Sequence, residues 1–124
     1  MRTRDDIEAY LTRSGLPHEE ISPDTWLVRA EAGREPFVVR LEGPLVLVRT
    51  NIGPVPKKGR EKYLADLLRA NAETLVHCSY GLAGDTVILS GALPLENLDY
   101  NEMISTLDDM SLAVARDDDA GKGD

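Results

Sequence analysis

The fold is decided by the stretch GDTVILSGALPLENLDYNEMISTL at Gly84–Leu107. It contains a short apolar, β-branched run, Val87, Ile88 and Leu89, which predicts a buried strand. Pro94 has no backbone N–H to donate to a sheet, so we expect this strand to end before Pro94.

A helix is predicted directly after the Leu-Pro-Leu linker. Asp99 is suited to cap the first turn, and Glu102 stands three residues on, where it can reach back to the cap. Helical spacing then favours a helix over Asn97–Ala115. Its apolar stripe consists of Tyr100, Met103, Ile104, Leu107 and Met110 or Ser111.

The whole chain predicts two more helices and five strands, one of which is the strand around Val87–Leu89. We expect helices at Thr3–Arg13, capped by Thr3 and ended by Gly15, and at Arg60–Thr74. A polar connector at Pro17–Pro23 precedes strands at Thr25–Glu31, Pro36–Glu42 and Leu45–Ile52, and two more strands lie near Val76–Ala83 and Asp85–Ala92. Short turns between neighbouring strands imply antiparallel pairing. The order α-β-β-β-α-β-β-α therefore predicts an α+β fold with one antiparallel sheet packed against helices.

Composition excludes several classes of function. The 124 residues carry a formal charge of −8, so binding to nucleic acid or to an anionic membrane surface is not expected. Cys78 is the only cysteine, which fits a reducing cytosol, and the sequence has neither a signal peptide nor an apolar run long enough to span a bilayer. We expect a cytoplasmic protein with a single domain over residues 1–116 and a disordered acidic tail over residues 117–124.

Two segments carry a resemblance to known proteins. LADLLRANAETL at Leu64–Leu75 and VILSGALPLENLDYNEMISTLDDM at Val87–Met110 resemble YbjN-type domains and class I type III secretion chaperones, the CesT/Tir chaperone-like family. The resemblance implies the secretion-chaperone fold, a small acidic homodimer and no catalytic residues. In the secretion chaperones an extended client segment wraps around the dimer, whereas YbjN-type proteins are often described as regulatory.

Two candidate surfaces follow. Val38, Val46 and Val48, together with Arg40, would form a partly apolar partner-binding surface if they lie on a sheet face open to solvent. The alternative is that the valines are core residues, because both parities of these strands are apolar. Leu64, Leu67 and Leu68 on the second helix are the candidate dimer interface. The strands also carry Arg29, Arg40 and Arg49, where the resemblance implies a smooth apolar client groove.

No residues are predicted to be catalytic, to bind a cofactor or to ligate a metal. His77 and Cys78 are strand neighbours whose side chains point to opposite faces. His18, Glu19 and Glu20 lack metal-ligand spacing, and Gly53–Gly59 does not have the order of a phosphate loop. No nucleophile, base and orienting group converge, so an enzyme is not predicted.

The sequence therefore predicts a module that binds a protein partner, either a secreted effector-like client or a regulatory protein. Binding would use strand addition at a sheet edge or apolar anchors on the sheet. The acidic body favours a partner with basic anchors. The alternative is a regulatory or structural subunit that pairs with a folded partner and has no unfolded client.

Overall fold

The computed structural model describes residues 2–30 and 33–122, with residues 118–122 described by backbone alone. Over these residues the chain forms three helices and one six-stranded sheet with the strand order β1-β2-β3-β4-β6-β5, every neighbouring pair antiparallel. The elements are α1 (Arg4–Ser14), β1 (His18–Ser22), β2 (Thr25–Val28), β3 (Phe37–Glu42), β4 (Leu45–Pro54), α2 (Arg60–Glu73), β5 (Ser79–Ala83), β6 (Thr86–Pro94) and α3 (Tyr100–Lys122). The predicted α+β class with one antiparallel sheet is confirmed.

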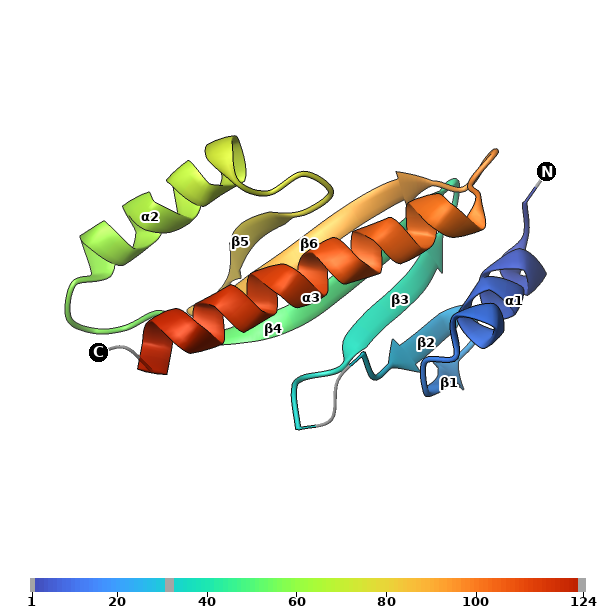
Figure 1. Cartoon of the computed structure of the whole chain (residues 1–124), viewed down its shortest axis with the longest axis horizontal. Helices are drawn as coiled ribbons and strands as arrows, with labels where there is room; N and C mark the ends of the chain where they lie inside the picture. Colours follow the sequence, from blue (N-terminus) through green and yellow to red (C-terminus); the bar gives the residue numbers. More distant parts are fainter. Residues whose placement is uncertain (1, 31–32, 123–124) are drawn as a thin grey trace.

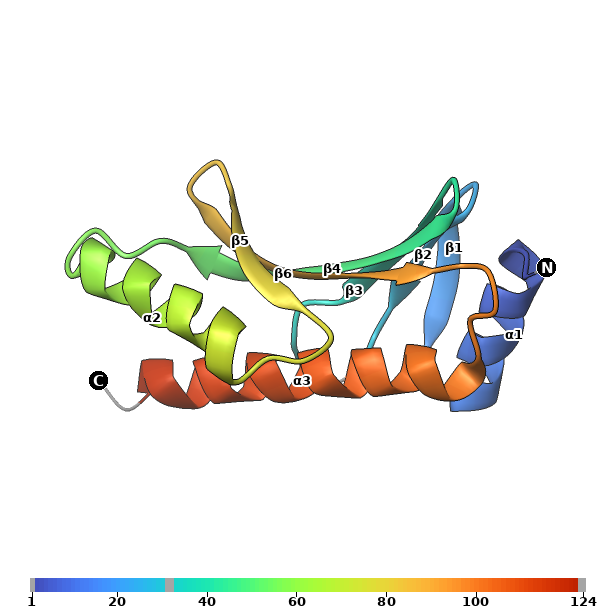
Figure 2. The same ribbon diagram turned by 90° about the horizontal axis from the view of Figure 1, so that it is seen from above.

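The helices leave one face of the sheet open. The longest helix, α3, runs along one face, with α2 beside β5 at one end and α1 beside β1 and β2 at the other (Figure 1). Seen from above, the sheet curves so that its ends rise away from α3, and none of the described helices covers the opposite face (Figure 2). We call this opposite face the outer face.

The core lies between the sheet and α3. Val39, Val46 and Val48 point toward the helix, since alternate residues of a strand face the same side. They pack in one cluster with Met103 and Leu107 of α3. Burial of each such side chain stabilises the fold by about 1.5–3 kcal/mol. This core therefore determines which face of the sheet packs against α3, and the opposite face takes no part in it.

In the stretch that decides the fold the cap at Asp99 is confirmed, but α3 begins at Tyr100 rather than Asn97, and the strand does not end before Pro94. Asp99 caps α3, because its Oδ1 accepts the Glu102 backbone N–H at 2.7 Å. β6, however, continues through Pro94, which stands opposite Leu45. The Leu95 N–H donates to the Pro44 carbonyl at 2.9 Å, so Pro94 occupies a position whose own N–H would point away from β4. Nothing pairs on that side, because β5 reaches only Ser90 of β6, and proline therefore disrupts no ladder bond.

One strand was not predicted. β1 occupies part of the expected connector and pairs with β2 at the edge of the sheet. None of its residues is buried, so its sequence HEEIS shows no apolar alternation. Periodicity cannot identify a strand of this kind, because the only partner it needs is the backbone of β2.

Other element bounds also differ from the prediction. β5 begins at Ser79 rather than Val76, because the Val76 and His77 backbone N–H groups donate to Asp109 of α3 instead of joining the sheet. β2 ends at Val28, and Glu31 lies outside the described residues. α3 continues to Lys122, into the segment where a disordered tail is predicted. The Tyr80 hydroxyl donates to the Asp117 carboxylate at 2.7 Å in that extension.

Candidate functional site

The outer face consists largely of apolar side chains, with arginine side chains between them. Its side chains alternate with the core residues along each strand, and Leu27, Val38, Leu47 and Ile88 are each only partly buried. Arg40 and Arg49 are exposed among them. An open face of this composition differs from the fully polar side that a one-sided sheet commonly presents to water.

Two hollows of about 510 and 530 Å³ lie side by side on this face. The first is lined by residues of β2, β3, β4 and the segment before β3. The second is lined by residues of β4, β6, the start of β5 and the segment before it. They share Leu47 and Arg49 of β4. We call the two together the outer trough. A groove with half-buried aliphatic walls and a few charged groups can accept an extended segment of another protein.

The structure separates the predicted partner-binding residues into two groups. Val38 and Arg40 lie on the outer face and line the first hollow. Val46 and Val48 turn toward α3 instead, because the register pairs Val39 with Val48 and Leu41 with Val46, and Val48 only borders the second hollow. Both are at most 1% exposed. Their predicted place on a surface is therefore wrong, and the core alternative holds for them.

Leu47 and Ile88 of the outer trough were missed by sequence reasoning. Leu45–Ile52 begins apolar on both parities, so the pattern alone does not say which parity faces the helices. The buried Thr50 has the parity of Val46 and Val48, and its hydroxyl donates to the Pro36 carbonyl at 3.1 Å. The alternation of Arg49 and Asn51 with Thr50 is the one sequence signal for the outward parity of β4.

The charges of the outer face are only partly paired. Arg40 contacts Glu42 on the same strand, with 2.9 Å between Nη2 and Oε2. Arg29 and Arg49 make no ion pair within the described part of the chain. Glu35 lines the first hollow as well. The outer trough is thus amphipathic, with one unpaired guanidinium at the junction of its two hollows.

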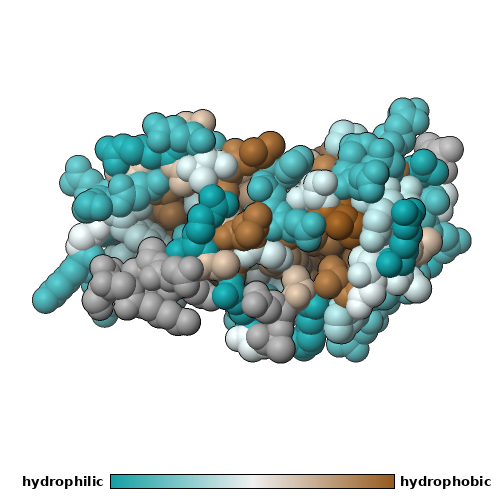
Figure 3. All heavy atoms as spheres, viewed as in Figure 1, coloured by the Kyte–Doolittle hydropathy of each residue, from teal (hydrophilic) through white to brown (hydrophobic). Residues whose placement is uncertain are grey.

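A second apolar surface lies on the helix side. Leu64, Leu67 and Leu68 of α2 line a hollow of about 290 Å³ together with Tyr80 and Leu82 of β5. α2 has no buried residue, and Leu68 is 69% exposed. Figure 3 shows brown apolar patches among hydrophilic residues on the face of the molecule that carries α3. The three predicted dimer-interface leucines are therefore brought together on one surface, while their role in a dimer stays a prediction.

Polar contacts fix α2 against β5. Asn71 binds the Tyr80 backbone twice, with Oδ1 accepting the N–H at 2.7 Å and Nδ2 donating to the carbonyl at 3.2 Å. The pKa of Tyr80 is raised, first by burial and then by the hydrogen bond to Asp117. Tyr80 therefore stays a neutral donor, and the α2–β5 surface is held in a defined geometry.

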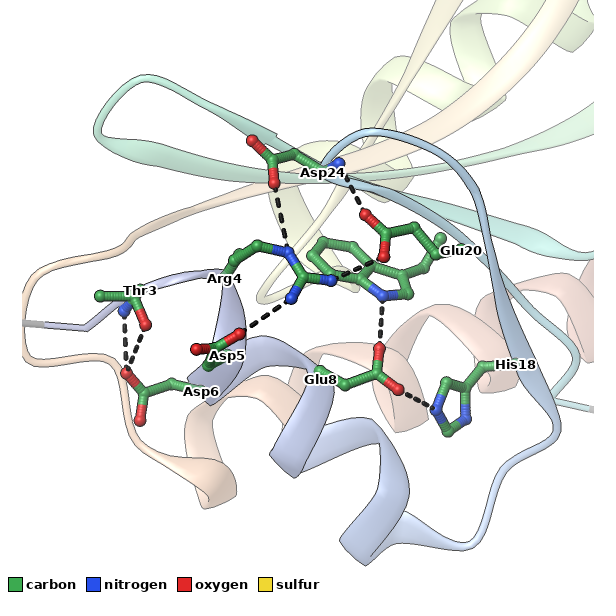
Figure 4. Close-up of polar contacts among 9 residues, drawn as sticks. Thr3, Arg4, Asp5, Asp6, Glu8, His18, Glu20 and Asp24 are labelled. Atoms are coloured by element: carbon green, nitrogen blue, oxygen red, sulfur yellow. Dashed lines mark hydrogen bonds and ion pairs between the residues drawn. The ribbon is translucent and has the colours of Figure 1, made fainter.

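At the other end of the sheet, charged side chains tie α1 to β1 and β2 (Figure 4). Arg4 contacts Asp5 at 2.8 Å, Glu20 at 2.6 Å and Asp24 at 3.5 Å, and its guanidinium lies 5.4 Å from the centre of the Trp26 ring. Such a network orders the edge strand, which has no core contacts of its own.

Neither the His77–Cys78 pair nor the group around His18 forms a reactive site. Burial, and then the nearby Asp109 carboxylate, raise the pKa of the Cys78 thiol to about 11, so it is not a thiolate at neutral pH. His18 faces the Glu8 carboxylate at 3.3 Å and the Leu16 carbonyl at 2.7 Å, contacts that hold α1 to β1. Within residues 2–30 and 33–122 no three His, Cys, Asp or Glu side chains gather in a metal-binding group.

Within those same residues no helix is both long and apolar enough to cross a membrane.

A protein-family model described as CesT_Tir_1 matches residues 1–120. Comparison with curated proteins finds no match.

Solved structures share the fold at low identity. A chain of the heterodimeric ExoU–SpcU complex, from the type III secretion system of Pseudomonas aeruginosa, has a TM-score of 0.73 at 17% identity over 89% of this chain and 93% of that chain. The Yersinia pestis type III secretion chaperone SycH, in complex with a fragment of YscM2, has 0.70 at 16% over 92% and 98%. YbjN from E. coli, described as a candidate transcription regulator, has 0.73 at 13% over 96% and 93%. The predicted resemblance to both groups is confirmed.

Proposed function

This chain belongs to the CesT_Tir_1 family, and on that premise we propose that it is a non-catalytic cytoplasmic module that holds a segment of a partner protein. The observation that carries the proposal is the outer trough, which no described helix covers. Its floor is aliphatic, so a partner segment gains about 25 cal/mol for each Å² of apolar surface removed from water.

The partner is proposed to bind in extended form. The outer trough is lined mainly by the four adjacent strands β2, β3, β4 and β6 and extends across them. This shape suits an extended chain with side chains on alternate positions rather than a compact ligand. Two of the similar folds are known from complexes, ExoU–SpcU and SycH with a YscM2 fragment. These complexes support a protein partner as the class of ligand.

We further propose that the module works as a homodimer through the α2–β5 surface. Leu64 and Leu67 are partly buried and Leu68 is exposed, and α2 has no buried residue. A second copy would cover Leu68, Tyr80 and Leu82 together. Self-association removes an apolar patch that a monomer would leave in water.

The dimer is tested by light scattering coupled to size exclusion. The Leu68→Asp variant should elute as a monomer, because a carboxylate in an apolar interface has no partner. Leu112→Asp is the matched control, since Leu112 is an exposed leucine on α3. A monomeric unmodified protein, or equal behaviour of the two variants, contradicts this interface.

The partner is tested by capture from the native cytosol with the tagged full chain. The expected result is one dominant protein, bound at one copy per dimer and released by Leu47→Asp but not by Leu112→Asp. Leu47 is chosen because it lines both hollows of the outer trough. Capture that Leu47→Asp leaves unchanged would exclude the outer trough as the binding site.

The alternative role is that of a regulatory subunit. The YbjN structure supports it, because its TM-score against this chain, 0.73, equals that of the ExoU–SpcU chain. In that case the partner is a folded regulatory protein. Proteolysis of the purified complex separates the two proposals: an extended client stays susceptible to protease outside its bound segment, whereas a folded regulator resists throughout.

A further inference from the structure

Arg49 occupies one of the two positions that a segment lying along both hollows of the outer trough must pass. It lines both hollows, and only Leu47 shares that property. Its exposed guanidinium makes no ion pair within the described residues, whereas Arg40 forms a surface ion pair with Glu42. A bound segment must therefore either pair with Arg49 or cover it.

Covering Arg49 with apolar groups alone would be unfavourable. A charge removed from water without a partner loses more free energy of hydration than the neighbouring aliphatic contacts return. A carboxylate solves this problem, because it accepts two parallel N–H bonds from a guanidinium in fixed geometry. A backbone carbonyl accepts fewer bonds and carries no charge.

The register sets the spacing of such a partner. Leu27, Val38, Arg49 and Ser90 stand in one row across four strands, since Leu27 pairs with Val38, Val38 with Arg49 and Arg49 with Ser90. Neighbouring strands are about 4.8 Å apart, and alternate side chains of an extended peptide are about 6.8 Å apart. A peptide that runs along this row therefore places one side chain over the Leu27–Val38 pair and the next over Arg49. The third then lies over β6, where Ser90 and Ile88 both project from the outer face.

We propose that the outer trough selects an extended segment in which an acidic side chain, paired with Arg49, alternates with apolar side chains on either side. This inference rests on the proposed function and refines the partner chemistry. It differs from the expectation of basic anchors, which follows from the net charge of −8. The exposed guanidinium of Arg49 lies at this junction, and charges more than about 8 Å away from it are largely screened at physiological salt.

The test uses three capped synthetic peptides with alternating leucine and serine that differ only at one central position, which is Glu, Gln or Lys. Each is titrated into the ¹⁵N-labelled full chain, and amide shifts report both affinity and location. We expect the Glu peptide to bind about tenfold more tightly than the Gln peptide, the effect of one charged hydrogen-bonded pair. The largest shifts should lie at Val38, Leu47, Arg49 and Ile88.

Variants of Arg49 make the test specific. Arg49→Gln should reduce the Glu preference to less than about twofold, and Arg49→Glu should move the preference to the Lys peptide. Arg116→Gln is the control, because Arg116 is an exposed arginine of α3, on the other side of the sheet. Circular dichroism confirms that each variant is folded.

The outcomes separate the inference from the proposed function. Equal binding of all three peptides on the outer face overturns the acidic selection but leaves a segment-binding module. Shifts confined to α2 and β5, or to β1, overturn the outer trough as the site. If no peptide binds anywhere on the chain, the inference and the extended-partner proposal both fail.

Discussion

Gly91 of β6 is a position where one added methyl group should strain the fold through a close contact. A Cβ placed there would lie 2.8 Å from the His77 carbonyl oxygen, about 0.6 Å inside an ordinary contact at 3.4 Å. The neighbour is backbone and cannot swing away as a side chain would. The segment carrying His77 is also held in place, because the His77 N–H donates to Asp109 at 3.1 Å. Gly91→Ala must therefore displace this segment or β6.

The size of the effect can be worked out from two opposing contributions. Overpacking of this kind costs about 1–3 kcal/mol. Replacing glycine by alanine also restricts the unfolded chain and returns about 0.4–1 kcal/mol. We therefore expect Gly91→Ala to lower the free energy of unfolding by about 1–2 kcal/mol, or the Tm by roughly 3–8 °C.

Gly81→Ala is the matched control on the neighbouring strand. Its added Cβ would meet only Ile88 side-chain atoms, at 3.7 and 3.9 Å, which are ordinary contacts. This variant should be neutral or more stable by up to about 1 kcal/mol. Urea unfolding followed by circular dichroism and by the fluorescence of Trp26, the single tryptophan, measures both variants.

A double variant tests the mechanism. Asp109→Asn weakens the tether on the His77 segment, so Gly91→Ala should cost less in that background than in the unmodified chain. If Gly91→Ala proves as stable as Gly81→Ala, or if its cost is unchanged by Asp109→Asn, the proposed collision with a tethered His77 carbonyl is refuted.

Three further predictions follow from named contacts. The hydrogen bond from the His77 backbone N–H, together with the one from Val76, lowers the pKa of Asp109 below its usual value of 3.8; the charged form therefore stabilises the fold above that value and stops doing so as the pH falls through the lowered pKa. Asp109→Asn should cost about 1–2 kcal/mol at pH 7 and much less near pH 2, as compared by urea unfolding at both pH values; an equal cost at both would contradict the charge argument. Trp26→Phe should cost about 2–4 kcal/mol by circular dichroism, because it removes a 2.6 Å bond from Nε1 to Glu8 and buried volume; a loss below 0.5 kcal/mol would show that the bond contributes little. Tyr80→Phe should loosen α2 and the end of α3, because the 2.7 Å bond to Asp117 is lost; faster proteolysis after Arg116 is the expected readout, and an unchanged cleavage rate would argue against this contact.

Local chemistry made much of the fold predictable. Caps at Thr3, Gly15 and Asp99 define helix ends within the sequence itself, and the helix and strand order follows from them and from apolar spacing. The antiparallel class follows from short turns. These signals act over a few residues, so an isolated sequence displays them.

The remaining features depend on residues that are distant in the chain. Val38 and Val46 look alike in sequence, and only the pairing of β3 with β4 sends one outward and the other into the core. β1 is a strand only because β2 lies beside it. The bond between Trp26 and Glu8 and the tether from Asp109 to His77 join separate elements, and no periodicity announces them. The outer trough could not be predicted from the sequence for the same reason, because its junction at Arg49 exists only after β6 has paired with β4.

The absence of buried residues from α2 and β1 also has a dynamic consequence. Segments with few buried contacts open at low free energy. Strands that have a paired strand on either side open only when the whole domain unfolds. Amide hydrogen exchange should therefore be fastest in α2 and β1 and slowest where β4 pairs with β6 beneath α3. An association that covers α2 would slow exchange there first, long before it changed global stability. The least protected helix of the isolated subunit would then be the most sensitive reporter of its assembly.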